Sequence, residues 1–340
     1  MRLTALALVL LASLAHAVEL NGNGRVWLGP GLDTNPNRGF IAGDPDALLF
    51  GLGELNGSAD WERVSLVGSY DLAFRKFITR PEADTLIQNA RLDGTLRLGK
   101  AFSVGLSGHA RDRRGADRDY SDLVGEGVID FRPDQSVDVR LRLGAHRFIY
   151  WPNFQYSFSG PDGTLLGRYR FDRRHSVSFF GSVNLRTYNA LTHELDEPDP
   201  PPQVTRRDSV FQVGASYTYR GPFHLTLGYS YYDQTSNSHG ESLRRHRLSA
   251  TYATKLPFDL TLLATTALQL TLYPDDIYLS TDILLLDDDE NSSSVTLKLV
   301  KPLSKHFEVD LRYALYVNLL PQSNLLYLRQ VVSAGVSFLF

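Results

Sequence analysis

The C-terminal segment of this chain alternates with a period of two, and the alternation ends with the chain at Phe340. One row of side chains is largely apolar and consists of Leu328, Gln330, Val332, Ala334, Val336, Phe338 and Phe340. The intervening row is mostly small or polar and consists of Arg329, Val331, Ser333, Gly335, Ser337 and Leu339. Because successive side chains of a β-strand point to opposite faces, the segment predicts a strand with one apolar and one mixed face.

Residues 1–17 have the composition of a secretory signal peptide. A single basic residue, Arg2, precedes the apolar run LTALALVLLASLA, and Ala15-His16-Ala17 fits the small-x-small cleavage pattern. We therefore expect the mature chain to begin near Val18 and to leave the cytoplasm. The apolar run is too short for a spanning helix, which needs about 20 apolar residues. The chain contains no cysteine, which excludes disulfides and thiolate metal sites.

The remaining sequence reads as period-two strands joined alternately by short turns and long polar connections. The short turns are predicted at Gly57–Trp61, Leu98–Phe102, Arg132–Ser136, Asp172–His175, Arg220–Phe223, Thr254–Asp259 and Lys301–His306. The long connections are predicted at Asp33–Asp46, Ile78–Thr85, Asp112–Tyr120, Trp151–Gly163, Asn189–Asp208, Asp233–Ser242, Pro274–Asn291 and Leu319–Asn324. These turns and connections join about sixteen strands, and counts of fourteen or eighteen also fit because Ile277–Leu286 could form extra strands.

The two faces of these strands differ in polarity. In the segment 307–318, the row from Phe307 to Val317 is apolar, whereas the alternate row contains Glu308, Asp310 and Arg312. A charged side chain facing hydrocarbon costs about 2–4 kcal/mol, so the apolar rows should meet lipid and the charged rows water. A soluble β-sandwich would also alternate, but the leader peptide and the terminal strand favour a membrane barrel. Plentiful aromatic residues, 17 Tyr and 18 Phe, agree with this interpretation.

The aromatic end of the last strand resembles the insertion signal of Gram-negative outer-membrane β-barrels. We identify Val332, Val336, Phe338 and Phe340 as the assembly signal. The segment Leu32–Gly39 is similar to the first loop of barrels that belong to tetratricopeptide scaffolds exporting polysaccharides or surface lipoproteins, although this chain has no such scaffold. The resemblance implies an all-β fold, a single antiparallel up-and-down transmembrane barrel over residues 18–340, in the outer membrane of a Gram-negative cell. Its partners would be outer-membrane lipid and the barrel-assembly machinery.

The inward rows of the predicted barrel are rich in arginine. The residues that we expect to line the lumen and set its selectivity are Arg91, Arg97, Arg111, Arg140, Arg142, Arg168, Arg170, Arg186, Arg245 and Arg247. With the other inward rows included, basic groups outnumber acids by about two to one. Rings of arginine favour anions in a pore. The four residues Arg140, Arg142, Arg168 and Arg170 are expected to form an anion-favouring constriction, unless ladders of arginine and acid simply hold the wall together.

These observations predict a hydrated, Arg-rich channel for anionic or sugar-like solutes, with an acidic polysaccharide as one candidate cargo. The alternative is a non-conducting barrel that docks an envelope-spanning secretion or motility complex, with periplasmic export or motility proteins as partners. A plugged barrel should place inward acids opposite inward bases, whereas a pore should show a surplus of one sign.

We expect no enzymatic activity, no cofactor, no metal site and no nucleic-acid partner. Ser107 and His109 lie two apart on one strand and so share a face, which is the geometry of a nucleophile and a base, but such pairs are common without chemistry. The acids Asp287–Glu290 fit a solvated turn better than a cation site. The sequence has no basic patch with a motif that reads nucleic acid.

Overall fold

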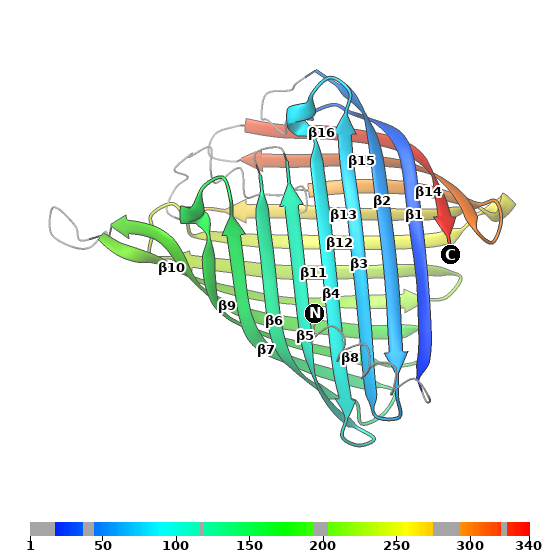
Figure 1. Ribbon diagram of the computed structural model, residues 1–340, viewed down its shortest axis with the longest axis horizontal. Helices are drawn as coiled ribbons and strands as arrows, with labels where there is room; N and C mark the ends of the chain where they lie inside the picture. The colour runs from blue at the N-terminus through cyan, green and yellow to red at the C-terminus, as the bar shows by residue number, and fades with distance from the viewer. Residues whose placement is uncertain (1–17, 37–43, 116–117, 194–202, 275–292, 321–324) are drawn as a thin grey trace, which may run out of the picture.

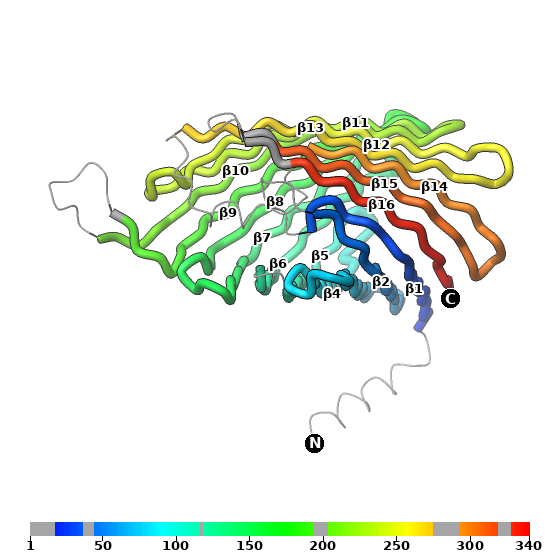
Figure 2. Tube along the Cα trace, turned by 90° about the horizontal axis from the view of Figure 1, so that it is seen from above, coloured from blue at the N-terminus to red at the C-terminus, as the bar shows by residue number. Residues whose placement is uncertain are grey.

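The computed structural model describes residues 18–36, 44–115, 118–193, 203–274, 293–320 and 325–340. Sixteen strands close into one antiparallel barrel in which each strand pairs with its neighbours in sequence and β1 pairs with β16 (Figures 1 and 2). The predicted fold and strand number are confirmed. Within the described ranges, no helix is long and apolar enough to cross a membrane.

The strands, in chain order, are β1 (Glu19–Asp33), β2 (Asp46–Asp60), β3 (Val64–Phe77), β4 (Thr85–Arg97), β5 (Phe102–Arg114), β6 (Tyr120–Phe131), β7 (Val137–Tyr150), β8 (Phe158–Arg170), β9 (His175–His193), β10 (Gln203–Arg220), β11 (Phe223–Ser236), β12 (Leu243–Lys255), β13 (Thr261–Leu272), β14 (Ser293–Pro302), β15 (Phe307–Leu320) and β16 (Leu325–Leu339). Single turns of 3-10 helix lie at Pro81–Ala83, Phe154–Tyr156 and Pro257–Asp259. The strands of the near wall cross those of the far wall at a steep angle, as the strand tilt of a barrel requires (Figure 1).

Several strands extend further than the sequence predicted. Gly57 was predicted to begin a turn, but β2 continues through it to Asp60. The strand continues because Gly57 pairs with Gly22 of β1 on one side and with Gly68 of β3 on the other. β10 begins at Gln203 and β8 at Phe158, within the long connections predicted at 189–208 and 151–163. These strand ends are polar because they project beyond the apolar band of the barrel. Their sequence therefore lacks the alternating apolar row that would have predicted a strand.

The barrel has an apolar outer surface, as expected for a wall that faces lipid. Leu248, Leu268, Leu311 and Val336 are each about half exposed or more, and they lie on the outward rows of β12, β13, β15 and β16. A soluble sandwich would bury such rows against each other. The outward rows therefore carry the predicted lipid face.

The seam between β1 and β16 closes the barrel through backbone and buried charge. The amide of Gly24 donates to the carbonyl of Phe340 at 2.8 Å, and the amide of Phe340 donates back at 3.1 Å. At the other end of the seam, Arg329 Nε donates to both carboxylate oxygens of Asp33 at 3.0 Å, and both side chains are fully buried. Figure 2 shows the C-terminal end of the chain lying beside β1.

The orientation of the barrel gives a topology prediction. If the short turns face the periplasm, an epitope tag inserted between β9 and β10, within residues 194–202, should be labelled by antibody on intact cells. The same tag in the turn at residues 221–222, between β10 and β11, should be labelled only after the outer membrane is permeabilised. The reverse pattern would overturn this orientation.

Candidate functional site

The inward face of the barrel wall holds the arginines that the sequence singled out. Strand register places Arg91 and Arg97 on the inward row of β4, Arg111 on β5, Arg140 and Arg142 on β7, Arg168 and Arg170 on β8, Arg186 on β9, and Arg245 and Arg247 on β12. The predicted assembly residues Val332, Val336, Phe338 and Phe340 lie on the opposite, outward row of β16.

The wall formed by β4–β8 is a ladder of ion pairs. Arg140 of β7 forms a bidentate pair with Asp130 of β6. Arg142, also on β7, lies 3.5 Å from Glu126 of β6. Arg132, in the turn that precedes β7, lies 3.1 Å from Asp138. In the predicted constriction of Arg140, Arg142, Arg168 and Arg170, acids of β6 lie beside the two β7 arginines, so two of the four charges are compensated.

The twofold surplus of inward bases was also overestimated. Glu54, Asp162 and Asp208 lie on inward rows, and the last two were predicted to be loop residues. Asp208 accepts hydrogen bonds from Arg206 at 3.1 and 2.8 Å, from Gln234 at 3.0 Å and from Ser236 at 2.6 Å. Because β8 and β10 are longer than predicted, these acids turn inward and neutralise part of the basic lining.

The opposite wall, β9–β14, is dominated by hydroxyl groups. Cross-strand register aligns one inward row of threonines that comprises Thr218, Thr226, Thr251, Thr265 and Thr296. A second row aligns Ser178 with Ser216, and Gly228 with Ser249. The same wall also carries inward charged side chains such as Arg186 and Arg247, so it combines hydroxyl groups with fixed charge.

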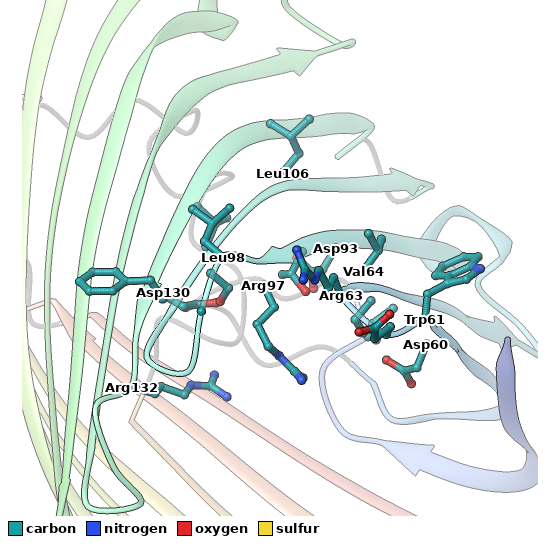
Figure 3. Close-up of a pocket in the computed structure, with 18 of the residues that line it drawn as sticks. Asp60, Trp61, Arg63, Val64, Asp93, Arg97, Leu98, Leu106, Asp130 and Arg132 are labelled. Atoms are coloured by element: carbon teal, nitrogen blue, oxygen red, sulfur yellow. The ribbon is translucent and has the colours of Figure 1, made fainter. Parts of the chain in front are cut away.

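A cavity of 1270 Å³ opens at the short-turn end of the barrel. Its lining combines acids such as Asp60 and Asp93 with bases such as Arg97, and the Arg97 and Arg132 side chains extend toward the same open space (Figure 3). Arg63 lies in the turn between β2 and β3, at the rim of this cavity.

Two further cavities continue from this one toward the long-loop end. The middle cavity, of 530 Å³, shares Arg132 and Arg140 with the short-turn cavity. The loop-side cavity, of 460 Å³, shares Ser230 and Arg247 with the middle cavity. The described side chains therefore leave a chain of polar cavities along the barrel axis.

The loop-side cavity gathers arginines from many strands. Its lining includes Arg111, Arg113, Arg118, Arg186, Arg206, Arg245 and Arg247. The sequence reasoning missed Arg113, Arg118 and Arg206, because it placed them in connections rather than on strands or at strand ends. An Arg-x-Asp spacing at Arg206 and Asp208, continuing the inward row of β10, was the signal that could have found one of them.

Arg206 is neutralised by two carboxylates, whereas Arg168 and Arg186 have neutral hydrogen-bond partners. Arg206 contacts Asp208 and lies 3.0 Å from Glu241 in the loop after β11. Burial raises the pKa of the Glu241 carboxyl, and the Arg206 guanidinium opposes that rise. In the described part of the chain, Arg168 donates to the hydroxyl of Ser178 at 3.3 Å and Arg186 donates to the amide oxygen of Asn184 at 3.1 Å, and neither forms an ion pair.

Ser107 and His109 both face the interior from β5, but no hydrogen bond joins them in the part of the chain that the structure describes. Ser107 instead lies opposite Asp93 of β4. No group of three or more His, Asp or Glu side chains within the described ranges could hold a metal ion. The acids Asp287–Glu290, the extra strands considered at Ile277–Leu286 and the signal peptide lie outside the described residues, as do residues 37–39 of the segment Leu32–Gly39.

Comparison with solved structures identifies the class of fold. The chain is similar to the outer-membrane channel DcaP of Acinetobacter baumannii, with a TM-score of 0.63, 10% identity, and coverage of 96% of this chain and 98% of that chain. It is also similar to OmpF of Salmonella typhi, solved in complex with daunomycin, with a TM-score of 0.52, 13% identity, and coverage of 94% and 97%. No family model and no curated protein matches the sequence. The fold is that of outer-membrane β-barrel porins and channels.

Proposed function

We propose that the protein is a passive outer-membrane channel for small polar solutes that favours anions. The observation that carries this proposal is the chain of three cavities, joined by shared lining residues, that runs from the short-turn end to the loop end. A barrel of sixteen strands is wide enough to leave an aqueous interior. Solutes would cross by diffusion past the inward charged groups and the inward hydroxyl groups of the wall.

The preference for anions rests on the distribution of compensated and uncompensated charge. The inward carboxylates Asp93, Asp130 and Asp208 are each paired with an arginine. Arg168 and Arg186, by contrast, have neutral partners among the described residues. A fixed cation in a low-dielectric wall raises the local concentration of anions and lowers their barrier to passage.

The ladder of ion pairs on β4–β8 supports a second candidate, a non-conducting barrel that docks an envelope complex. Paired charge such as Arg140 with Asp130 stiffens the wall without favouring either ion, which is what a docking barrel needs. The two candidates differ in whether the cavities conduct, so electrophysiology separates them.

The charge of Arg168 and Arg186 gives a prediction for selectivity. The double variant R168Q/R186Q should assemble normally, because lumen changes affect selectivity more than stability. The two lost charges, each at about 8 Å from a passing ion in water, together change its energy by about 1 kcal/mol, so the anion-to-cation permeability ratio should fall by roughly fivefold or more. The reversal potential of purified protein in a planar bilayer under a KCl gradient measures this ratio.

The matched control is R147Q, which removes the same charge from the outward row of β7. It should leave the permeability ratio unchanged, because Arg147 does not line the pathway. A shift as large in R147Q as in the double variant would contradict the assignment of selectivity to the two inward arginines.

A further inference from the structure

In the loop-side cavity, Arg186 is held in place by a relay of side-chain hydrogen bonds that starts at two carboxylates. Asn184 donates its side-chain amide to Nδ1 of His146 at 2.9 Å and to Asp162 at 3.1 Å. His146 therefore carries its ring proton on Nε2, which lies 2.6 Å from Asp122. With its amide protons committed, Asn184 presents its carbonyl oxygen to Arg186 Nε at 3.1 Å.

This relay fixes the direction of the Arg186 guanidinium. Its Nε–H is used by Asn184, and the planar group lies over the ring of Phe158 with 4.7 Å from its central carbon to the ring centroid. Asp208 lies directly opposite Arg186 on the neighbouring strand and attracts its charge, but its hydrogen bonds come from Arg206, Gln234 and Ser236. Arg186 lines the cavity, hydrogen-bonds with Tyr188 and forms no ion pair within the described residues.

The wall beside Arg186 is a row of aromatic rings. Phe148 and Phe158 stack at 5.3 Å between centroids, and the row continues on either side to Tyr120 at 5.3 Å and Tyr188 at 5.1 Å. Phe148 is partly exposed, and Tyr232 lines the same cavity. A cavity of 460 Å³ is within the usual size range of small-ligand sites, about 300–1000 Å³.

We propose that this cavity is a binding subsite for a carboxylate carried on a six-membered ring, such as an aromatic acid or a cyclic sugar acid. Arg186 would bind the carboxylate through its two terminal nitrogens, because a guanidinium and a carboxylate form a bidentate pair. The ring of the solute would pack against Phe148 and Tyr232. Asn184 and His146 act as positioning residues that keep the guanidinium turned toward the solute. The subsite rests on the proposed channel function, since it would select solutes on their way through the barrel.

Isothermal titration calorimetry on the full-length barrel in detergent micelles tests the subsite with benzoate, glucuronate and acetate as probes. Wild-type protein should bind one of the two ring-bearing acids saturably and at least tenfold more tightly than acetate. Whichever of benzoate and glucuronate binds more tightly shows whether the subsite prefers an aromatic ring or a sugar ring. Equal binding of acetate and both ring acids, or no saturable binding of any, would overturn the proposal.

Variants then locate the site. R186Q should weaken binding of the preferred acid at least tenfold, whereas R168Q, which removes an equal charge from the middle cavity, should change it by less than twofold. N184A should weaken binding by about threefold in the wild-type background and have no further effect in R186Q, because its role acts through Arg186. Equal effects of R186Q and R168Q, or additive effects of N184A and R186Q, would contradict the assignment.

The calorimetric test is independent of conduction. Binding that depends on Arg186 in a barrel that passes no current would support the subsite and reject the channel. Current without any binding of a ring-bearing acid would reject the subsite and leave the channel standing.

Discussion

Replacing Phe338 and Phe340 together by serine is expected to abolish insertion of the barrel into the outer membrane. The ring of Phe338 lies 5.3 Å from that of Phe307 on β15 and 5.8 Å from that of Phe340, so the two substitutions remove the aromatic contacts at the end of β16. The Phe340 ring also covers Gly24 on the outward face of β1, where a larger side chain would collide with it. The apolar row that faces lipid and the assembly machinery would be interrupted at its end.

Heat-modifiable mobility of membrane fractions measures folded barrel directly, and we expect less than a tenth of the wild-type level. The control is S333A, which alters the inward row of the same strand and should insert normally. Wild-type levels of folded, membrane-embedded F338S/F340S would contradict the assembly signal predicted at Val332, Val336, Phe338 and Phe340.

The second large effect is expected at the β1–β16 seam. R329A would leave the Asp33 carboxylate buried without its main partner, and breaking a buried ion pair in this way costs about 3–5 kcal/mol. The seam should therefore open at lower denaturant concentration, because Asp33 and Arg329 join the first and last strands. Urea unfolding of the refolded barrel, followed by tryptophan fluorescence, measures the loss.

R312A serves as the matched control for the seam. Arg312 lies on the inward row of β15, where it is exposed and forms no ion pair within the described residues. Its removal should change the free energy of unfolding by less than about 1 kcal/mol, as is usual for surface charge. If R329A and R312A lost the same stability, the buried pair would not be what secures the seam.

The outward row of the last strand shows why the fold could be predicted from sequence. A wall that meets lipid needs an apolar side chain at every second position, and the row from Leu328 to Phe340 meets that need with one polar exception, Gln330. The inward position of Arg186 followed from the same alternation, because its strand neighbours Leu185 and Val183 are apolar and exposed to the outside.

The strand ends and the charge pairing could not be predicted in the same way. Arg206 and Asp208 lie where β10 projects beyond the apolar band, and a polar strand in water has the composition of a loop. The pairing of Arg140 with Asp130 depends on the register between β6 and β7, and a shift by one residue would turn either side chain to the other face. The relay from Asp122 on β6 through His146 on β7 to Arg186 on β9 spans β8 as well, so it requires three such registers at once.

Planar-bilayer recording of the refolded wild-type protein tests the central claim most directly. With a tenfold KCl gradient across the bilayer, the proposed channel should give discrete conductance steps and a reversal potential whose sign indicates that chloride is more permeant than potassium. Folded, heat-modifiable protein that inserts but gives no conductance steps, or a reversal potential of the opposite sign, would contradict an anion-favouring channel.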